Sequence, residues 1–348
     1  MKIAILTPTF SPFSGIDRLA EIQARKFLKE GHQVTVYCLK SGMEVRGAKI
    51  IEIGMFRTKR ETTNEVSMPK SPVAERLYRL LMFLDGGKIQ RCAEEVSRCD
   101  LVVSHLYPMN LIAQKAKRRN PRLNYVYSHA GVGITEAYSP LEKLYLKVFK
   151  WLNNRSISNC DKAISISRFL ADELEKETGI KSEVEYIPVD GKRFNLKVDG
   201  APVRKKYRLG RSKVLLYVGR ISPHKGVHLL MDVYKKIKEK VPAVRLLIVG
   251  KHTFPQYSKK LKEMADTGVI FTGFIPDKEL PKYYAACDVY ATCSLWEGFD
   301  MPITEAEACG KPSVAFDVGA HKEVLKKGEL VPKGDLDAFA DAAVRLLK

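Results

Sequence analysis

The chain has 348 residues, 45% of them hydrophobic and 28% charged, and it carries a formal net charge of +19 at pH 7. This composition excludes a disordered or collagen-like chain, and the length is enough for two domains. No apolar run reaches the roughly 18 residues of a membrane-spanning helix, and the seven cysteines include no Cys-x-x-Cys pair, so we expect a protein of the reducing cytoplasm without a zinc site.

The first half of the chain alternates between buried strands and amphipathic helices. Apolar and β-branched runs predict the strands, and apolar residues at helical spacing predict the helices between them. In chain order, the pattern predicts strands at 2–7, 33–39, 49–55, 100–104, 124–128 and 163–167, and helices at 17–30, 73–84, 142–158 and 168–178. This alternation indicates a parallel sheet with helices on both faces.

Two residues of this half stand where such a sheet binds ligands, at the carboxyl ends of its strands. Gly15 lies at the turn between the first strand and its helix, where a glycine lets a phosphate approach the backbone closely. His129 directly follows the strand at 124–128. Both have a structural alternative, because a single glycine often serves only a turn and a lone histidine more often packs than binds.

The second half repeats the alternation. It predicts strands at 214–218, 245–249, 269–272, 288–293 and 313–316, and helices at 227–240 and 335–347. A strand followed by a turn at Pro188 places the domain boundary near residue 190, and the basic segment 200–211 is predicted to be an exposed connector. We therefore predict an α/β protein with two Rossmann-like, doubly wound parallel-sheet domains, residues 1–190 and 191–348.

Residues 294–320 combine a loop, a short helix, a strand and a turn. Pro302 suits the first turn of a helix, and Gly310 is typical of a helix end. Glu297 and Glu305 bracket the start of this helix. A helix N-terminus attracts phosphate, and carboxylates accept hydrogen bonds from sugar hydroxyls, so the stretch predicts a site for a nucleotide sugar. The alternative is that each glutamate only complements the helix dipole.

Residues 297–312, which read Glu-Gly-Phe-Asp-Met-Pro-Ile-Thr-Glu-Ala-Glu-Ala-Cys-Gly-Lys-Pro, resemble the E-G-F-G-x-P-x-x-E-A-x-A-x-G-x-P segment of retaining GT-B glycosyltransferases. This is the glycogen-synthase and mannosyltransferase-like group, glycosyltransferase family 4 (glycosyl transferases group 1). The resemblance implies two Rossmann-like domains facing a central cleft. It also implies transfer of a hexose from a nucleoside-diphosphate sugar, with retention of the anomeric configuration and without a metal or other cofactor.

A second motif, Gly219-Arg220-x-x-x-x-Lys225-Gly226, is similar to the G-R-x-x-x-x-K-G pair of the same family. Arginine can fork two phosphate oxygens and lysine acts as a point charge, so the two cations are expected to clamp the diphosphate. The resemblance implies catalytic roles for Arg220, Lys225, Glu297 and His129, and donor binding by Gly15, Gly298, Phe299, Asp300, Met301 and Glu305, with Glu305 on the ribose.

One position departs from the family pattern, because Asp300 stands where glycine is usual. An aspartate here could cap the helix that begins at Met301, or it could face the donor. The single Asp-x-Asp sequence, Asp335-Leu336-Asp337, is interpreted as a helix cap and dipole complement rather than as a metal site. The chain ends just after that predicted helix, whereas the resembled fold usually adds a further helix.

The basic excess is uneven, since residues 101–150 hold eight Lys and Arg against two Asp and Glu. Donor binding in the resembled family uses the second domain, so we assign this excess and the stripe at 73–84 to the acceptor. The expected acceptor is a polyprenyl-phosphate-linked or saccharide molecule, met in the cytoplasm or by peripheral attachment to the anionic inner face of the membrane. Alternatives are a nucleic-acid-binding protein without catalysis, although no nucleic-acid motif is present, and a sugar-nucleotide epimerase or glycoside phosphorylase on the same fold.

Overall fold

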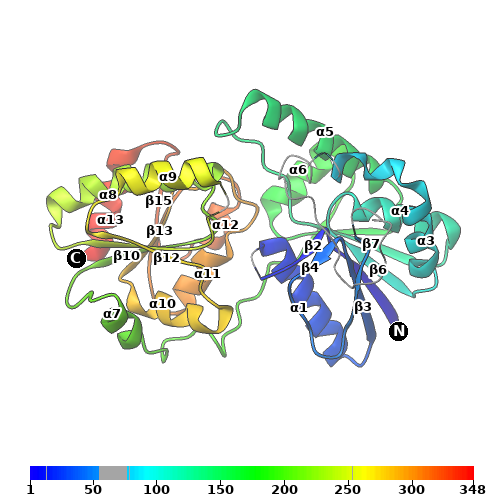
Figure 1. Cartoon of the computed structure of the whole chain (residues 1–348), viewed down its shortest axis with the longest axis horizontal. Coiled ribbons are helices and arrows are strands. Elements are labelled where there is room, and N and C mark those ends of the chain that lie inside the picture. The colour runs from blue at the N-terminus through cyan, green and yellow to red at the C-terminus, as the bar shows by residue number, and fades with distance from the viewer. Residues whose placement is uncertain (13, 55–76, 78, 253) are drawn as a thin grey trace. The chain divides into compact units, whose positions relative to one another are not determined.

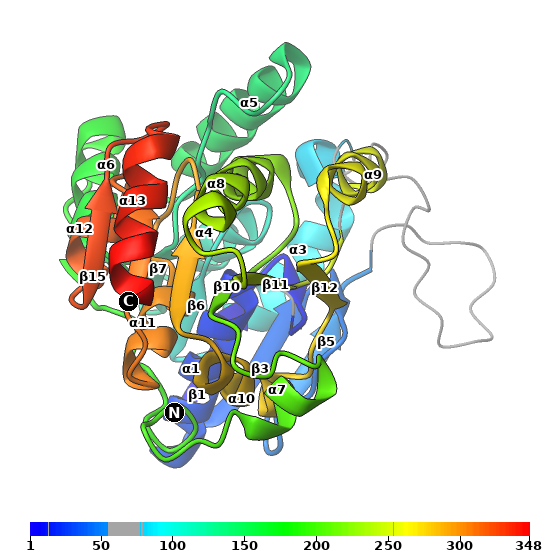
Figure 2. The same cartoon turned by 90° about the vertical axis from the view of Figure 1, so that its left-hand side faces the viewer.

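The computed structural model describes residues 1–12, 14–54, 77, 79–252 and 254–348 (Figures 1 and 2). The chain forms two compact units. The first contains Met1–Val132 and Leu141–Tyr186, and the second contains Gly133–Pro140 and Ile187–Lys348. The main division lies close to the boundary predicted near residue 190. The small segment 133–140, however, groups with the second unit, which the sequence pattern did not indicate.

The first unit is built on a seven-stranded sheet. Its strands are β1 (Lys2–Leu6), β3 (Gln33–Cys38), β5 (Lys49–Glu52), β6 (Leu101–Ser104), β7 (Asn124–His129), β8 (Lys162–Ser165) and β9 (Glu183–Val184). They pair in the order β5-β3-β1-β6-β7-β8-β9, with every pair parallel. Two short strands, β2 (Thr9–Phe10) and β4 (Lys40–Ser41), form a separate parallel pair.

Helices cover both faces of this sheet, which explains why its strands are apolar throughout. Ile3 and Ile5 of β1 pack in one cluster with α1 (Gly15–Lys29), whereas Ala4 and Leu6 pack in another with α3 (Gly86–Val96) and α4 (Met109–Arg119). The unit also contains η1 (Met82–Leu84), α5 (Pro140–Ser156) and α6 (Arg168–Thr178). The helix predicted at 73–84 lies in part outside the described residues, and the part that is described is helical at 79–81.

The second unit is built on a six-stranded sheet. Its strands are β10 (Val214–Val218), β11 (Arg245–Val249), β12 (Val269–Gly273), β13 (Val289–Thr292), β14 (Ser313–Phe316) and β15 (Gly328–Val331). The order is β12-β11-β10-β13-β14-β15, again with every pair parallel. In Figure 1, α8 (Val227–Lys240), α9 (Pro255–Met264) and α13 (Leu336–Leu347) cover one face, and α7 (Ala201–Lys206), α10 (Leu280–Ala286) and α11 (Met301–Ala308) cover the other.

Both sheets have the strand order of a doubly wound Rossmann fold, so the predicted fold class is confirmed. In such sheets, ligands bind beyond the carboxyl ends of the strands where the winding direction reverses. These reversal points lie between β1 and β6 in the first unit and between β10 and β13 in the second. The Asp335 carboxylate accepts a hydrogen bond from the Ala338 N–H at the start of α13, which confirms its interpretation as a helix cap.

Most residues of segment 200–211 are exposed, as predicted, but the segment is not a simple connector. This segment contains α7, which packs against α10. A Cβ atom on Gly200 would lie 2.4 Å from the Ala286 backbone nitrogen, and the Arg204 guanidinium donates to the Ala286 carbonyl at 2.5 Å. The long basic side chains of segment 200–211 suggested a solvated loop, but the Arg204 side chain donates hydrogen bonds to backbone carbonyl groups instead.

Segment 133–140 contacts the rest of the second unit through Gly133, Glu136 and Tyr138. Gly133 lies flat against Trp296, since an added Cβ would be 2.3 Å from the indole Cδ2. The Tyr138 ring lies beside the His224 imidazole, with centroids 5.6 Å apart, and Glu136 forms an ion pair with Lys333 at 2.7 Å. Trp296 and His224 are the direct neighbours in sequence of Glu297 and Lys225. The segment therefore packs on two loops that carry predicted site residues.

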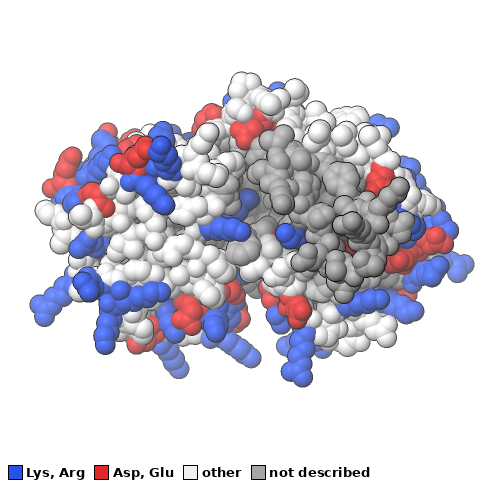
Figure 3. Space-filling view, in the orientation of Figure 1, with Lys and Arg blue, Asp and Glu red and all other residues white. Residues whose placement is uncertain are grey.

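Across the described ranges, we find no helix with the length and apolar character that a membrane span requires. On the face drawn in Figure 3, Lys and Arg side chains are scattered over both units, with Asp and Glu side chains among them. Many of these charges are paired on the surface, where an ion pair contributes little to stability.

Candidate active site

Three loops meet at the carboxyl edge of the second sheet. Because β10, β13 and β14 are adjacent and parallel, the loops that follow them emerge side by side. The loop after β10 carries Arg220 and Lys225, the loop after β13 carries Glu297 and Asp300, and the turn after β14 leads to His321 at the start of α12 (His321–Val324). Residues that are up to about a hundred positions apart in the sequence are thus gathered at one edge.

Backbone hydrogen bonds connect these loops. The Leu295 N–H donates to the His224 carbonyl at 2.9 Å, and the Ala320 N–H donates to the Glu297 carbonyl at 3.0 Å. Two glycines allow the close approach. Gly226 has a φ of +61°, and an added Cβ would lie 1.9 Å from the Cys293 carbonyl oxygen; Gly319 has a φ of +53°, and its Cβ would lie 2.0 Å from that of Glu297.

Lys225 and Glu297, two residues predicted from separate motifs, form an ion pair. The Lys225 Nζ lies 2.5 Å from Glu297 Oε1, and the two side chains are only 20% and 9% exposed. Burial alone would raise the pKa of Glu297, but the charges of Lys225 and His321 and the hydrogen bond from Lys225 lower it. Glu297 is therefore an ionised carboxylate at neutral pH. Arg220 is exposed and has no ion-pair partner among the described residues, so its guanidinium faces solvent.

The remaining predicted donor residues of the second unit lie on or next to α11. Gly298 and Phe299 are buried in the loop before the helix, and Met301 is its first residue. Glu305 is 2% exposed, and its carboxylate accepts a hydrogen bond from the Tyr284 hydroxyl at 2.8 Å. The glutamates predicted to bracket this helix start are therefore both buried, unlike residues that only complement a dipole at a surface.

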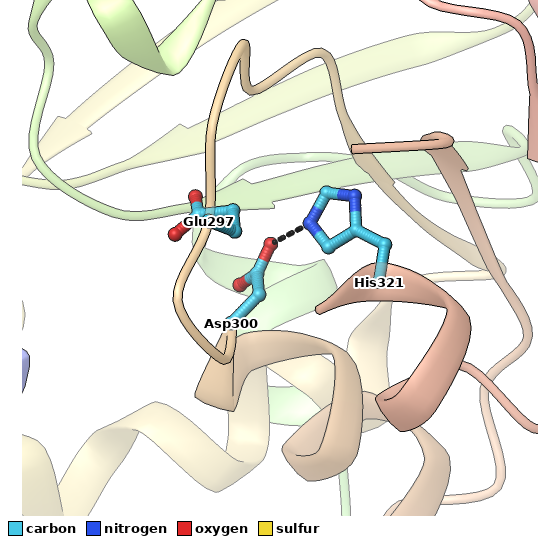
Figure 4. Close-up of side chains that lie close together, drawn as sticks. All are labelled: Glu297, Asp300 and His321. Carbon is cyan, nitrogen blue, oxygen red and sulfur yellow. Dashed lines mark hydrogen bonds and ion pairs between the residues drawn. The ribbon is translucent and has the colours of Figure 1, made fainter. Parts of the chain in front are cut away.

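Asp300 takes the N-cap position of α11, but its side chain makes no capping hydrogen bond. Its Oδ2 instead lies 3.0 Å from Nε2 of His321 (Figure 4). His321 is not among the predicted site residues; it lies beyond the end of β14, at the start of α12. The capping interpretation of Asp300 is thus wrong for its side chain, and a histidine partner takes the place of the helix N–H groups.

Glu297, Asp300 and His321 also form a group whose potential ligand atoms lie within 4.8 Å of one another. A metal ion could in principle bind three such atoms. The Lys225 ammonium, however, already supplies a cation to Glu297, and His321 Nε2 lies at hydrogen-bond distance from Asp300. The contacts are those of two neighbouring ion pairs. That donor binding needs no metal stays a prediction.

In the first unit, His129 lies at the carboxyl end of β7 and is 5% exposed. Its Nδ1 is 2.8 Å from the Tyr127 hydroxyl, which in turn accepts a hydrogen bond from Asn153. Burial and the charge of Lys150 lower the pKa of His129 to about 3, so the ring is neutral. Because the Tyr127 hydroxyl accepts from Asn153, it can donate its own proton to Nδ1 of His129. The proton of the neutral imidazole then lies on Nε2, and this N–H has no acceptor among the described residues.

Gly15 is the first residue of α1, at the same edge of the first sheet. A Cβ atom built on it would meet no atom within 4 Å. The protein therefore does not itself require glycine at this position, and the space in front of the backbone is open. This openness fits a ligand that approaches the backbone, and the role of Gly15 in donor binding stays a prediction.

Comparison with known proteins matches both halves of the chain to glycosyltransferase models. Residues 13–189 match the model described as Glycosyltransferase Family 4, and residues 212–348 match that described as Glycosyl transferases group 1. A GDP-mannose-dependent alpha-(1-6)-phosphatidylinositol monomannoside mannosyltransferase of Mycolicibacterium smegmatis is 29% identical over 335 residues, which cover 91% of this chain and 81% of that protein. A mannosylfructose-phosphate synthase of Agrobacterium fabrum is 31% identical over 204 residues, which cover 55% and 45%.

Solved structures show the same fold. The structure of HepE from Anabaena in complex with UDP and glucose has a TM-score of 0.76 and 21% identity, and the match covers 100% of this chain and 89% of that one. WaaG, a glycosyltransferase involved in lipopolysaccharide biosynthesis, has a TM-score of 0.73 and 17% identity over 99% and 90%. At this level of identity, the likeness establishes the fold alone.

Proposed function

Because this chain belongs to glycosyltransferase family 4 and is a glycosyltransferase, we propose that it transfers a hexose from a nucleoside-diphosphate sugar to a lipid-linked or saccharide acceptor, with retention of the anomeric configuration. The observation that carries the proposal is the meeting of the β10, β13 and β14 loops, which brings Lys225, Glu297 and the start of α11 together. It combines cations, a helix N-terminus and buried carboxylates, the groups that a nucleotide sugar needs.

The leaving diphosphate would be held by Arg220, Lys225 and the N-terminus of α11. As the glycosidic bond breaks, negative charge grows on the diphosphate, and cations fixed in advance stabilise that charge more in the transition state than in the bound donor. Arg220 faces solvent and is available to fork two phosphate oxygens. Lys225 is preorganised by its contact with Glu297.

The transferred sugar and the ribose would be bound by carboxylates. Glu297 is ionised and nearly buried, so it can accept hydrogen bonds from sugar hydroxyls in a site where water competes poorly. Glu305 would bind the ribose. We assign the neutral His129 to the sugar, because its Nε2–H lacks an acceptor in the described structure and a hydroxyl oxygen would supply one.

Donor binding is expected to need no divalent metal. The charges of Arg220 and Lys225 and the dipole of α11 would supply the positive charge that a metal ion otherwise brings to a diphosphate. We expect UDP-, GDP- or ADP-sugars, screened by thermal shift, to include one that raises the melting temperature equally with and without EDTA. Transfer that stops in EDTA and returns on adding magnesium or manganese would contradict the metal-free mechanism. The anomeric configuration of the product, read by NMR, tests retention.

We propose an acceptor with an anionic, lipid-linked head group. On α5, large apolar side chains are exposed along one stripe at helical spacing, with Leu141 77%, Leu144 59%, Val148 40% and Trp151 60% exposed. Leu77 and Leu84, at the end of the predicted stripe 73–84, are 53% and 68% exposed. Lys143 and Lys147 lie between these side chains in the sequence, as expected for a helix that lies on an anionic membrane surface. Lys150 pairs with Glu173 and Glu177 instead.

Liposome co-sedimentation tests this attachment. Each Lys or Arg near an anionic surface contributes about 1 kcal/mol, so we expect binding to anionic vesicles that weakens with salt, and little binding to neutral ones. Replacing Leu144 and Trp151 by glutamate should reduce the bound fraction several-fold, whereas Leu196→Glu, at a residue 78% exposed on the second unit, should not. Equal partitioning to neutral and anionic vesicles, or none at low salt, would leave a soluble saccharide as the acceptor.

A further inference from the structure

Asp300 and His321 form a buried pair beside the proposed sugar-binding carboxylate. The side chain of His321 is fully buried, and that of Asp300 is 4% exposed. His321 is fixed at both ring nitrogens, since Nδ1 lies 2.6 Å from the Phe316 carbonyl oxygen and Nε2 lies 3.0 Å from Asp300 Oδ2. Figure 4 shows the imidazole of α12 and the carboxylate at the start of α11 pointing toward each other, with Glu297 alongside.

The protonation of this pair follows from its contacts. The Phe316 carbonyl only accepts, so the Nδ1 of His321 must carry a proton. The contact between Nε2 and Asp300 then needs a second proton, which the imidazole and the carboxyl share. Burial lowers the pKa of His321, but the hydrogen bond and charge of Asp300, the charge of Glu297 and the Phe316 carbonyl raise it overall. Burial and the charge of Glu297 raise the pKa of Asp300 as well, and the hydrogen bond and charge of His321 oppose that rise. The pair therefore holds one proton between the two side chains at a buried position.

Two observations argue against a purely structural role of Asp300 in the loop. Its φ is +67°, in the left-handed region that glycine adopts without strain and that costs an aspartate about 1 kcal/mol or more. Glycine, the usual residue of the resembled family here, would make the same turn without a buried charge. Moreover, the second carboxylate oxygen, Oδ1, forms no hydrogen bond with a described residue, because the contact with His321 uses Oδ2.

We propose that Asp300 is a specificity-determining residue, whose Oδ1 accepts a hydrogen bond from one hydroxyl of the transferred sugar, and that His321 is the residue that positions it. This inference rests on the proposed function, because it needs a nucleotide sugar in the site. It deepens that function by adding a second carboxylate to the one assigned there.

The surrounding charges support this role. Glu297 and Asp300 have carboxylate oxygens close enough to bind one small molecule, and each has its own cation, Lys225 for the first and His321 for the second. With one proton shared by Asp300 and His321, the four groups carry no net charge, so the pocket does not repel a neutral sugar. A pair of fixed acceptors favours a sugar with hydroxyls at matching positions and disfavours one that leaves either acceptor unpaired.

The test separates the sugar from the diphosphate. Isothermal titration would measure UDP, GDP and ADP, and their glucose and mannose conjugates, on the full chain and on the Asp300→Asn and Asp300→Gly variants. We expect the dissociation constants of the free diphosphates to stay within about threefold. We define the sugar gain as the ratio of the dissociation constant of the free diphosphate to that of its sugar conjugate. It should fall about tenfold or more in Asp300→Gly, and less in Asp300→Asn, which keeps a neutral acceptor oxygen. Both residues suit a positive φ, so the variants should fold.

Deoxy analogues of the bound nucleotide sugar identify the hydroxyl. For the native chain, removal of one particular hydroxyl should weaken binding by the same factor as Asp300→Gly weakens binding of the intact nucleotide sugar. The Asp300→Gly variant should bind this analogue as tightly as it binds the intact nucleotide sugar. The control is Asp317→Asn, in the turn after β14, where Asp317 pairs with Lys322 at 2.9 Å; it should leave the sugar gain unchanged. For the positioning role, His321→Ala should reduce the sugar gain without changing diphosphate affinity, and His321→Gln, which retains a donor toward Asp300, should restore part of it.

Four results would count against the inference. A sugar gain unchanged in Asp300→Gly, or a loss spread evenly over all deoxy analogues, would overturn it and leave the proposed function in place. Diphosphate affinity that falls in parallel with the sugar gain would show that Asp300 only shapes the loop. If the native chain binds none of these nucleotides or nucleotide sugars, the proposed function fails and this inference fails with it.

Discussion

Replacing Lys225 with alanine is expected to lower turnover by about 100- to 1000-fold, the usual effect of removing one preorganised charge contact from a transition state. Lys225 is the part of the proposed phosphate clamp that the fold fixes most firmly, because Glu297 holds its ammonium at 2.5 Å before any donor arrives. The rate of sugar transfer at saturating donor measures the effect. Lys235→Ala, which removes an exposed lysine of α8, is the matched control and should be neutral.

Removing Lys225 also leaves a buried carboxylate without its cation, so a loss of activity could reflect a loss of folding. The double variant Lys225→Ala/Glu297→Gln removes both charges and should melt closer to the native protein than Lys225→Ala does, yet remain inactive. A Lys225→Ala protein with near-native turnover would exclude this lysine from the catalytic site. A double variant that recovers turnover together with stability would show that Lys225 has a structural role only.

Substitution of Gly226 by alanine should destabilise the second unit by about 3 kcal/mol. Two costs add: a left-handed backbone costs a non-glycine residue about 1–2 kcal/mol, and forced displacement in a packed site typically costs about 1–3 kcal/mol more. The displacement is unavoidable because the new Cβ would lie 1.9 Å from the Cys293 carbonyl oxygen. Moving this turn would also shift Lys225, so we expect donor binding to weaken together with stability.

Gly334→Ala is the matched control, since Gly334 has a φ of +86° in the same unit and its added Cβ would meet no atom within 4 Å. It isolates the conformational cost from the collision. Thermal or denaturant unfolding of both variants measures the difference, which should be about 1–3 kcal/mol. Equal destabilisation by the two substitutions would mean that the contact between Gly226 and Cys293 relaxes freely and does not hold the loops together.

The sequence predicted most of the second unit because its signals are local. The runs at 214–218, 245–249 and 313–316 became β10, β11 and β14 with the predicted bounds, since buried parallel strands are apolar along their whole length. Lys225 and Glu297 were chosen from motifs that lie far apart, and the fold brings them into contact. The order of the strands in the sheet produces this contact, and the spacing of the motifs along the chain does not predict it.

Other features depend on contacts that no local pattern reveals. The partner of Asp300 could not be foreseen, because His321 reaches it from another loop and a lone histidine carries no signal of its own. The basic residues at 200–211 suggested a solvated connector, whereas Arg204 donates to a buried carbonyl. Its role depends on the Ala286 carbonyl, more than eighty residues later, and that partner is known only from the fold.

The position of segment 133–140 limits where chimeras that exchange one unit can be joined. The polypeptide passes between its two units three times, after residues 132, 140 and 186. A chimera joined at a single point near residue 187 would combine the Trp296 of one parent with the Gly133 of another, and Lys333 with a foreign position 136. Exchange of one unit between homologues therefore requires two further junctions, so that the eight-residue segment is inherited together with residues 187–348.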